Sequence, residues 1–537
     1  MQLKSDIPAQ KLRGAYYTPS AIASFILRWG MVGNADADML EPSCGDGSFL
    51  RQIVAERMPF GHLTAVEFDK GEADKARAVG LRDCEVINDD FHRFCMTTQK
   101  RFDFIFGNPP FIRYQNYSKD QQLLADGIFR NAGLKRSKLT NAWAAFVVGC
   151  SLLLKERGKM AFVLPTDLLQ VGYAKQIRDY LVSNFNRIVV VSFKRLAFEG
   201  IQQDVLLLLC DRTGTTEHRI NFIEVEDADV LQRLSFKSME SSSKHIDTLS
   251  DKWNHYFLDR EELDFLNGIK AGSMHCIGSY ANVEVGITTG SNHYFTVPQS
   301  TVEEYGLQDY SRPLVGRNAQ LSGLSFMESD WHQNVVNGDR ANLLVFLPGV
   351  REVGDDGVRS YIAYGEQQGI DKGYKTGIRD DWYVIPSIKL SDAFFLCRSD
   401  VYPTFSLNQA QAYATSTLHR VSIKEGVDHR ALVVSYYNSL SFAFAEILGR
   451  KFGGGALELM PSEVEGIFLP YRDDNGALFD EVDQMVRSKK AIDEILAFTD
   501  MELLHNGMGF SVSEVEMARR IWRKLLGHRL HGRSFYK

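Results

Sequence analysis

The stretch ADMLEPSCGDGSFLRQIVAERM, residues 37–58, changes its hydrophobic pattern twice. It begins as a short apolar segment, turns at Gly45 and Gly47, and continues with apolar residues at helical spacing. Strand, glycine turn and helix in this order form the repeating unit of a doubly wound sheet. Another strand-like segment, HLTAVEF at 62–68, follows, so the helix would connect two parallel strands. The stretch therefore predicts an α/β fold.

The same alternation continues to about residue 240. Ile22, Phe25, Ile26 and Trp29 recur at helical spacing, and Gly30 would cap that helix. Further helices are expected at 70–80, 142–154 and 173–185, and further strands at 101–107, 159–165, 187–193 and 204–210. Strands separated by helices predict a mostly parallel, Rossmann-like sheet covered on both faces. The last two strands follow each other closely, so we expect them to form an antiparallel pair at the sheet edge.

Beyond residue 240 the alternation stops, and short strands, turns and scattered aromatic residues take over. We expect three parts: an α/β domain at 1–240, a mixed α+β domain at 241–475, and a helical segment at 476–537.

The bulk properties are those of a globular protein. The chain has 537 residues, a net charge of −7 and no apolar run near the roughly 20 residues of a membrane span. Its N-terminus lacks the apolar core of a signal peptide, so we expect a cytoplasmic protein without a membrane partner. The seven cysteines stand singly, which argues against a disulfide framework and against structural zinc, and we expect no metal site.

The loop after the first strand carries acidic residues. Glu41 and Asp46 would repel a phosphate group, and Glu67 closes the next strand, where an acidic side chain commonly binds both ribose hydroxyls. In NDDF, residues 88–91, Asp90 can accept a hydrogen bond from an adenine amine while Phe91 covers the ring. This set suits a cationic nucleoside, and S-adenosylmethionine carries a sulfonium, an amine and an adenosine.

The order of motifs resembles a known family, the class I methyltransferases. More narrowly, it is similar to the γ-class amino-methylating DNA methyltransferases of the TaqI-like and Eco57I-like groups. The motifs are GAYYTP at 14–19, LEPSCGDGSF at 40–49, AVEF at 65–68, NDDF at 88–91, GNPPF at 107–111, KMAFVLP at 159–165 and FEGIQQDVLLLL at 198–209. The resemblance implies a cofactor site for S-adenosylmethionine made of Tyr17, Thr18, Pro19, Glu41, Pro42, Ser43, Cys44, Gly45, Asp46, Gly47, Glu67, Phe68, Asp90, Phe91 and Asn108.

The segment FDFIFGNPPFIRYQ, residues 102–115, would carry the chemistry. Two prolines end the strand and fix the loop, so the side-chain oxygen of Asn108 and the carbonyl of Pro109 are preorganised acceptors for the hydrogens of an exocyclic amine. Pro110 stiffens the loop, and Phe111 offers a ring on which a flipped-out base can stack. By the resemblance, Phe198 would hold the other face of the base. An Asn-first loop in the family mostly goes with adenine.

The second domain would be a target-recognition domain that binds double-stranded DNA. Its family-like pieces are VEVGITTGSN at 283–292, RPLVGRNAQ at 312–320 and KFGGGALELMPSEVEGIFLP at 451–470. Arg317 and Asn318 can read base edges, although a structural ion pair explains Arg317 equally well, and Lys451 can approach phosphate. In the first domain the basic candidates for phosphate contact are Arg113, Lys119, Lys135, Arg136 and Lys138.

Three interpretations stay open. The first is a site-specific N(6)-adenine DNA methyltransferase of a restriction-modification or related defence system, or an orphan enzyme; N(4)-cytosine is the nearest variant. The second is an RNA or protein-glutamine methyltransferase, and the third a non-catalytic DNA-binding subunit. Only about 14 residues precede AYYTP, so we expect any cognate restriction endonuclease to be a separate protein.

Overall fold

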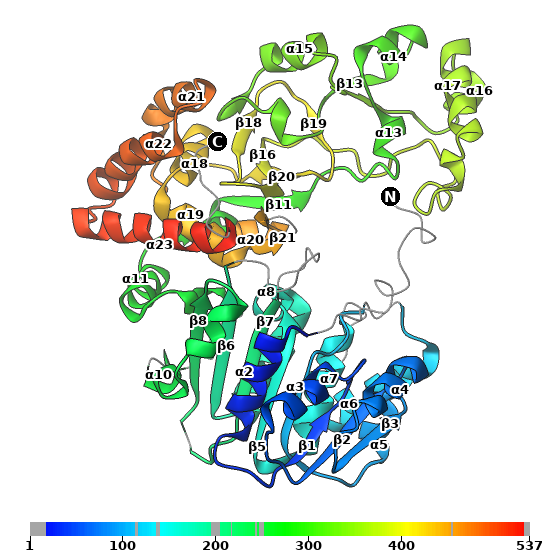
Figure 1. Ribbon diagram of the computed structural model, residues 1–537. Coiled ribbons are helices and arrows are strands. Elements are labelled where there is room, and N and C mark those ends of the chain that lie inside the picture. Colours follow the sequence, from blue (N-terminus) through cyan, green and yellow to red (C-terminus); the bar gives the residue numbers. More distant parts are fainter. Residues whose placement is uncertain are drawn as a thin grey trace. The chain divides into compact units, whose positions relative to one another are not determined.

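The structure is a computed structural model that describes residues 18–112, 116–135, 140–194, 205–215, 217–241, 244–245, 252–452 and 455–530. The chain divides into two compact units, Met1–Arg260 and Glu261–Lys537 (Figure 1). The division falls after Arg260, whereas the end of the αβ alternation had placed it after residue 240. The helices expected as a third part belong to the second unit.

The first unit is built on a nine-stranded sheet with the order β3-β2-β1-β4-β5-β7-β6-β8-β9. The strands are β1 (Asp38–Glu41), β2 (His62–Glu67), β3 (Cys84–Asn88), β4 (Phe102–Gly107), β5 (Leu154–Pro165), β6 (Arg187–Phe193), β7 (Val205–Asp211), β8 (Arg219–Val225) and β9 (Lys244–His245). Strands β3, β2, β1, β4 and β5 pair in parallel, in that order. The predicted doubly wound α/β fold is confirmed.

The antiparallel pairing of β6 and β7 is also as predicted, but their place at the sheet edge was wrong. β8 pairs in parallel with β6, and β9 pairs with β8, so both extend the sheet beyond β6. β7 lies between β5 and β6 and is antiparallel to both. The pattern did not reveal β8 because Asn221 and Glu224 interrupt its apolar residues.

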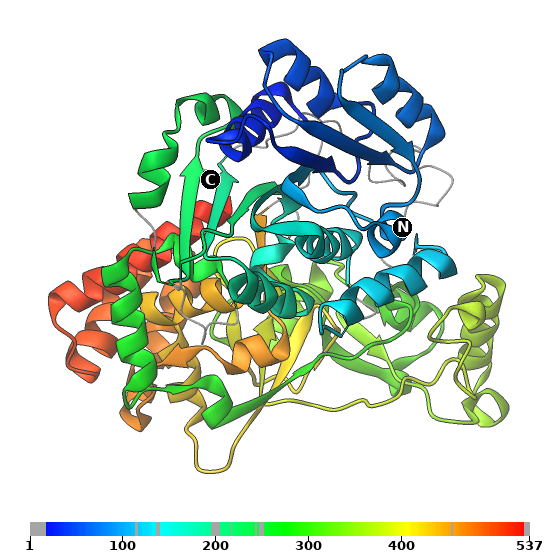
Figure 2. The ribbon, with the colours of Figure 1, turned by 90° about the horizontal axis from the view of Figure 1, so that it is seen from below.

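Helices cover both faces of this sheet. On one side lie α2 (Ser20–Met31), α3 (Ser48–Glu56) and α4 (Lys70–Ala78), and on the other α5 (Phe91–Thr97), α6 (Lys119–Asn131), α7 (Ala142–Leu153) and α9 (Lys175–Asn184). Successive residues of β4 alternate between the faces: Phe104 and Phe106 pack toward α2 and α3, and Ile105 toward α7. Figure 2 shows the helices of the first 80 residues in blue on one side of the strands and those of residues 119–184 on the other.

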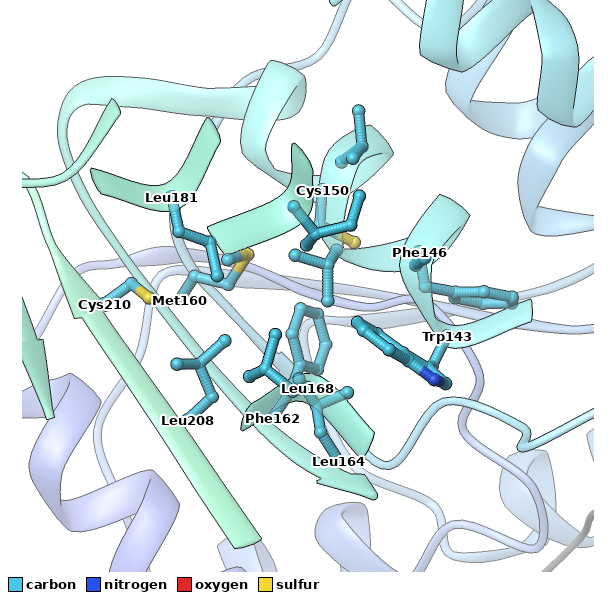
Figure 3. Packing of buried hydrophobic residues seen from close by; sticks show 14 of the residues in the cluster. Trp143, Phe146, Cys150, Met160, Phe162, Leu164, Leu168, Leu181, Leu208 and Cys210 are labelled. Carbon is cyan, nitrogen blue, oxygen red and sulfur yellow. The ribbon is translucent and has the colours of Figure 1, made fainter. Parts of the chain in front are cut away.

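The core under α7 explains why that helix is apolar around its whole circumference. Trp143, Phe146 and Cys150 of α7 belong to one buried cluster with Phe162 of β5 and Leu208 of β7, and Figure 3 shows Trp143 and Cys150 on the same side of the strands as Phe162 and Leu208. Eleven of the twelve residues of α7 are buried. Such a helix is an internal layer, and it holds β5 and β4 in a fixed position; the predicted Asn108–Phe111 loop follows β4.

Gly30 has a different role from the predicted helix cap. Helix α2 continues through it to Met31. A Cβ atom at Gly30 would lie 2.0 Å from Cζ of Phe104, so the glycine lets the helix approach the sheet closely. The sequence pattern predicted that the helix ends at Gly30, whereas in the folded protein Gly30 is the point at which the helix contacts the sheet.

The second unit contains a five-stranded sheet of order β11-β20-β16-β18-β14 and smaller sheets of four, three and two strands. The five strands are β11 (Ala281–Val285), β20 (Leu418–Ile423), β16 (Ala393–Leu396), β18 (Phe405–Asn408) and β14 (Ser325–Phe326). Its C-terminal helices are α18 (His429–Tyr436), α19 (Ser439–Leu448), α21 (Phe479–Arg487), α22 (Ile492–Thr499) and α23 (Val512–Leu530). Trp522 of α23 packs on Phe442 of α19, with ring centroids 5.6 Å apart. The terminal helices therefore share a core with the rest of this unit.

Within the described ranges no single helix has the length and apolar composition to cross a membrane. The helices α18 and α19 would meet that test only as a pair, and they are bent by 75° at the break between them.

Candidate active site

The carboxyl ends of β1, β2 and β4 bring the predicted site residues together. Leu40 pairs with Ile105, and Glu41 with Ala65, so the ends of these parallel strands lie side by side. A Cβ atom at Gly107 would lie 3.4 Å from Cδ of Pro42. The loops after β1 and β4, far apart in the sequence, are thus in contact at one edge of the sheet.

The loop after β1 is held by backbone hydrogen bonds. Cys44 donates its N–H to the carbonyl of Val66 at 3.0 Å, and Gly45 donates its N–H to Oε2 of Glu67 at 2.9 Å. Oε1 of Glu67 accepts from the N–H of Asp69 at 2.7 Å. The Glu67 side chain is therefore fixed in direction, and each of its oxygens keeps room for a second donor such as a ribose hydroxyl.

The two glycines of this loop do different things. Both have positive φ, 53° at Gly45 and 86° at Gly47. A Cβ atom at Gly47 would lie 3.1 Å from Cα of Ala76 in α4, so Gly47 allows helix packing. A Cβ atom at Gly45 would meet no atom of the described residues within 4 Å. The backbone of Gly45 thus faces open space, where a ligand can approach it.

Three carboxylates, those of Glu41, Asp46 and Glu67, lie close enough around this loop for their charges to influence one another. Glu41 is only 1% exposed, and no described residue lies within hydrogen-bonding distance of its Oε2. Burial, followed by the nearby charges of Glu67 and Asp46, raises the pKa of Glu41 well above its usual value. Burial also raises the pKa of Glu67. Arg51 donates to Oδ2 of Asp46 at 2.6 Å, while Oδ1 of Asp46 is buried without a partner among the described residues.

A cation would satisfy this set of groups. An unpartnered buried carboxylate is costly, and a positive ligand would restore its ionised form. The residues present therefore fit the predicted ammonium- or sulfonium-bearing ligand, and they do not suit a phosphate.

Asp90 caps helix α5, and each of its carboxylate oxygens already accepts a hydrogen bond from the protein. Its Oδ1 accepts from the backbone N–H of His92 at 2.7 Å and lies 2.7 Å from Nδ1 of the same residue. Gln121 donates its Nε2 to Oδ2 of Asp90 at 2.9 Å. Burial alone would raise the pKa of Asp90, but these hydrogen bonds and the charge of His92 outweigh it and lower the pKa to about 2. Asp90 is thus a permanent acceptor.

The two predicted aromatic neighbours differ in exposure. Phe91 is 3% exposed and stacks on Phe146 with ring centroids 4.6 Å apart, inside the core below α5. Phe68, directly after Glu67, is 69% exposed. Phe68 therefore offers an exposed apolar surface beside the predicted ribose-binding carboxylate. The ring of Phe91, in contrast, is buried in the core and already stacks on Phe146.

The Asn108–Phe111 loop leaves β4 at the same edge. Ser43 donates its hydroxyl to the backbone carbonyl of Asn108 at 3.4 Å, which ties the two loops together. Pro109 is buried, and Phe111 is half-buried against the cores on both faces of the sheet. Beyond the loop, Ala142 donates its N–H to the carbonyl of Ile112 at 2.9 Å. The loop is therefore anchored at both ends.

The remaining predicted residues are placed as follows. Thr18 is buried, and Pro19 precedes the first turn of α2. Lys119 in the first turn of α6 and Lys135 after its end are exposed. Tyr17, Arg113, Arg136, Lys138 and Phe198 lie outside the described residues.

In the second unit, Arg317 forms an ion pair with Asp339, as the structural alternative had it. Asn318 accepts a hydrogen bond from Thr404 at 3.4 Å. Lys451 lies half-buried in β21 (Arg450–Phe452). In the described part of the chain no three His, Cys, Asp or Glu side chains are grouped so that they could hold a metal ion.

Sequence reasoning missed the residues that hold Asp90. Gln121 had a readable signal, because Ser118 and Gln121 form the capping box that starts α6. The sequence could not show that the same Gln121 reaches Asp90, which lies 31 residues earlier. His92 gave no signal, since a histidine inside a short helix has many ordinary roles.

Comparisons with known proteins identify related sequences for both parts of the chain. Residues 66–198 match the family model described as Eco57I restriction-modification methylase, and residues 250–504 match that of the C-terminal domain of the type II methyltransferase M.Eco57I. The chain is 23% identical over 506 residues to the type II methyltransferase M.AccI of Acinetobacter calcoaceticus, covering 90% of this chain and 91% of the relative. It is 23% identical over 469 residues to the type II methyltransferase M.XamI of Xanthomonas campestris pv. amaranthicola, covering 85% of each.

Among solved structures, DrdV in a DrdV–DNA complex shares the fold. The likeness covers 89% of this chain and 58% of that chain, with 14% identity and a TM-score of 0.52. The two family models match a large part of each unit, and M.AccI is similar over almost its whole length. The chain belongs to the Eco57I-like class of methyltransferases.

Proposed function

We propose that the protein transfers the methyl group of S-adenosylmethionine to the exocyclic N(6) amine of an adenine flipped out of double-stranded DNA at a specific site. One observation carries the proposal: the Asn108–Phe111 loop lies against the loop that carries the unpartnered carboxylate Glu41, joined through Ser43 and Asn108. An acceptor pair for an amine thus lies beside a site that suits a sulfonium compound.

The cofactor would be held by the carboxylates and the open backbone described above. Glu67 would bind the ribose, Asp90 the adenine amine and Phe68 the ring face, while Glu41 and Asp46 would receive the positive methionine end. S-adenosylmethionine, when bound, supplies an electrophilic methyl group. The chain's own residues orient the acceptor of that group and exclude water.

The target amine is a poor nucleophile because its lone pair is delocalised into the ring. The side-chain oxygen of Asn108 and the carbonyl of Pro109 would accept hydrogen bonds from the two amine hydrogens and favour a pyramidal nitrogen. Burial of Pro109 and the anchors at both ends of the loop keep these acceptors in place, so little reorganisation is needed. The nitrogen would form its bond to the methyl group as the sulfonium–methyl bond breaks and leaves a neutral thioether, and the nitrogen would then lose a proton to water; this sequence requires no metal ion.

Phe111 would stack on the flipped base, and Phe198 would take its other face. Unstacking a base costs a few kcal/mol, and aromatic contact on the extruded base offsets part of it. The half-buried position of Phe111 against both cores makes it a rigid support.

DNA is favoured as the substrate because the relatives with high coverage are type II methyltransferases. On this reading the first unit, up to Arg260, contains the catalytic domain expected at 1–240, the second unit, from Glu261, contains the target-recognition domain expected at 241–475, and a separate restriction endonuclease would recognise the same site. Lys119, Lys135, Asn318 and Lys451 stay candidates for DNA contact. Arg317 is the weakest candidate, because a base contact would compete with its ion pair to Asp339.

The test is methyl transfer from labelled S-adenosylmethionine to unmethylated genomic DNA, with single-molecule sequencing to locate the mark. Asn108→Ala should lose about 10²- to 10³-fold in rate, the effect of removing one preorganised electrostatic partner, and should still bind the cofactor. Asn131→Ala, at the end of α6, is the matched control and should keep full activity.

The outcomes separate the alternatives. Label in adenine at one recurring motif supports the proposal. Label in cytosine refutes the adenine assignment and shows that the enzyme methylates N(4) of cytosine. Protein that binds the cofactor and methylates RNA or protein glutamine, and not DNA, refutes it.

A further inference from the structure

A loop of the second unit carries two apolar side chains into solvent. It runs from Lys372 to Ile378 and follows the short helix η8 (Ile370–Lys372). Tyr374 is 89% exposed and Ile378 78%. Single exposed apolar side chains are common on protein surfaces, so exposure alone decides nothing. What matters is how firmly this loop is built.

Hydrogen bonds inside the loop hold its shape. Thr376 is buried, and its hydroxyl donates to the carbonyl oxygens of Ile370 and Gly373. Gly377 donates its N–H to the carbonyl of Gly373 at 2.7 Å. The side chain of Thr376 therefore points inward and acts as an internal tether, while Tyr374 points away from the protein.

A second segment of the chain, around Thr289 and Gly290, packs against the loop and against Arg379, which follows it. Arg379 donates to the carbonyl of Thr289 at 2.7 Å, and its guanidinium lies 5.9 Å from the ring centroid of Phe295. Gly290 has φ +89°, and a Cβ atom there would lie 3.0 Å from a guanidinium nitrogen of Arg379 and 3.1 Å from Cγ2 of Thr376. The glycine turn of the motif VEVGITTGSN is thus shaped to fit under this loop.

The loop combines an exposed aromatic residue with two lysines. The segment KGYKTGI, residues 372–378, has two exposed lysines, Lys372 and Lys375, and it is flanked by Asp371, whose Oδ1 is buried, and by the exposed Asp380. The nearby Asp381 is used internally, since it accepts the N–H of Gly349 at 2.9 Å. An aromatic side chain between two lysines on a preformed loop matches the chemistry of nucleic acid, because bases have π-faces and phosphates are anionic.

We propose that the loop Lys372–Ile378 is a contact surface for double-stranded DNA, in which Tyr374 and Ile378 pack against bases or sugars and Lys372 and Lys375 pair with phosphates. This inference rests on the proposed function and adds the surface through which the second unit holds its substrate. An enzyme that extrudes a base must unstack the duplex, and proteins that distort DNA use apolar side chains as wedges. Because the loop is preformed, binding costs little ordering of its backbone.

The experiment compares Tyr374→Ala, Ile378→Ser and the pair Lys372→Gln/Lys375→Gln with wild-type protein. Fluorescence anisotropy measures binding to a short unmethylated duplex that contains the enzyme's recognition site, over a range of salt concentrations. Tyr374→Ala should weaken binding about tenfold, the effect of losing one base–aromatic contact. The lysine pair should lower the slope of log Kd against log salt by about one per lost phosphate contact.

The controls separate DNA contact from folding. Val353→Ser, at an 85% exposed position of α16 (Val350–Val353) in the same unit, should change neither quantity. Tyr374→Phe should keep most of the affinity, and all variants should keep the wild-type melting temperature and cofactor affinity.

The failures are distinguishable. If wild-type protein methylates DNA and the loop variants bind it equally well with the same salt slope, the inference is overturned and the proposed function stands. If the variants instead lose a self-association seen by size exclusion, the loop belongs to contact with a second copy, which also overturns it. Wild-type protein that binds cofactor and no duplex DNA refutes both.

Discussion

Replacing Glu41 by glutamine should stabilise the protein and weaken cofactor binding. Glu41 is buried with an unpartnered Oε2 among the described residues, and burial raises its pKa well above the usual value. Between the unfolded pKa of about 4.3 and the raised folded pKa, the folded protein holds a proton that the unfolded chain has lost. The free energy of unfolding therefore falls by about 1.4 kcal/mol for each pH unit in this window.

Glutamine has nearly the shape of the protonated side chain and does not titrate. Because the folded pKa of Glu41 is raised, Glu41→Gln should gain stability at neutral pH by about 1.4 kcal/mol for each unit that separates the folded from the unfolded pKa. A larger rise in pKa gives a larger gain. Near pH 4, below both pKa values, the melting temperatures of variant and wild type should converge.

Cofactor binding should show the opposite effect. A cationic ligand favours the ionised carboxylate, so binding to wild-type protein should release a proton and strengthen with rising pH, by up to about tenfold per unit. The measurement belongs below about pH 7, where the amine of the ligand is already protonated. Calorimetric titration in two buffers of different ionisation enthalpy counts the protons released.

Glu67→Gln is the matched control, since burial raises the pKa of Glu67 as well. Each variant should remove its own share of the proton release. A Glu41→Gln protein with a lower melting temperature across this pH range and an unchanged cofactor affinity would refute the reasoning.

The remaining predictions concern packing and a buried ion pair. Gly30→Ala should destabilise the protein by about 1 to 3 kcal/mol or more in urea unfolding, because its Cβ would overlap the ring of Phe104. Gly268→Ala is the control in helix α11 (Arg260–Ala271), where a Cβ meets no atom of the described residues within 4 Å. It should stabilise the protein by about 0.5 to 1 kcal/mol. Equal effects of the two substitutions would contradict the close approach of α2 to β4. Arg529→Met should cost about 3 to 5 kcal/mol, because Arg529 and Glu446 are buried and paired at 2.7 Å, and the charge of Glu446 would be left alone. Adding Glu446→Gln should recover part of that loss, and a double variant less stable than Arg529→Met would show that the cost lies in packing.

Local patterns predicted the elements that build the sheet. Short apolar runs such as RIVVVSF and VLLLLC have the length of strands buried on both faces, and the helical periodicity between strands implied the parallel crossovers. The same reasoning failed where an element is only partly covered. Polar residues interrupt the apolar pattern of β8. Helix α6 lacks a long apolar periodicity, so it was not predicted, although its capping box is visible in the sequence.

The candidate site was predictable to the level of its loops. Parallel strands expose their carboxyl ends at one edge, so residues that follow β1, β2 and β4 had to meet there. Their individual states were not predictable. Phe91 and Phe68 look alike in the sequence, yet one is buried on Phe146 and the other is exposed.

The α/β alternation, the glycine and proline turns at strand ends and the types of residue available for chemistry could be predicted from local patterns, because they depend on periodicity and on backbone dihedral preferences within a few residues. Folding was needed to show that Gly30 is a contact point, that Oε2 of Glu41 is buried without a partner among the described residues, that Gln121 and His92 bind Asp90, and that hydrogen bonds hold the loop of Tyr374. Burial and hydrogen-bond partners are set by residues distant in the chain, and no local pattern contains them.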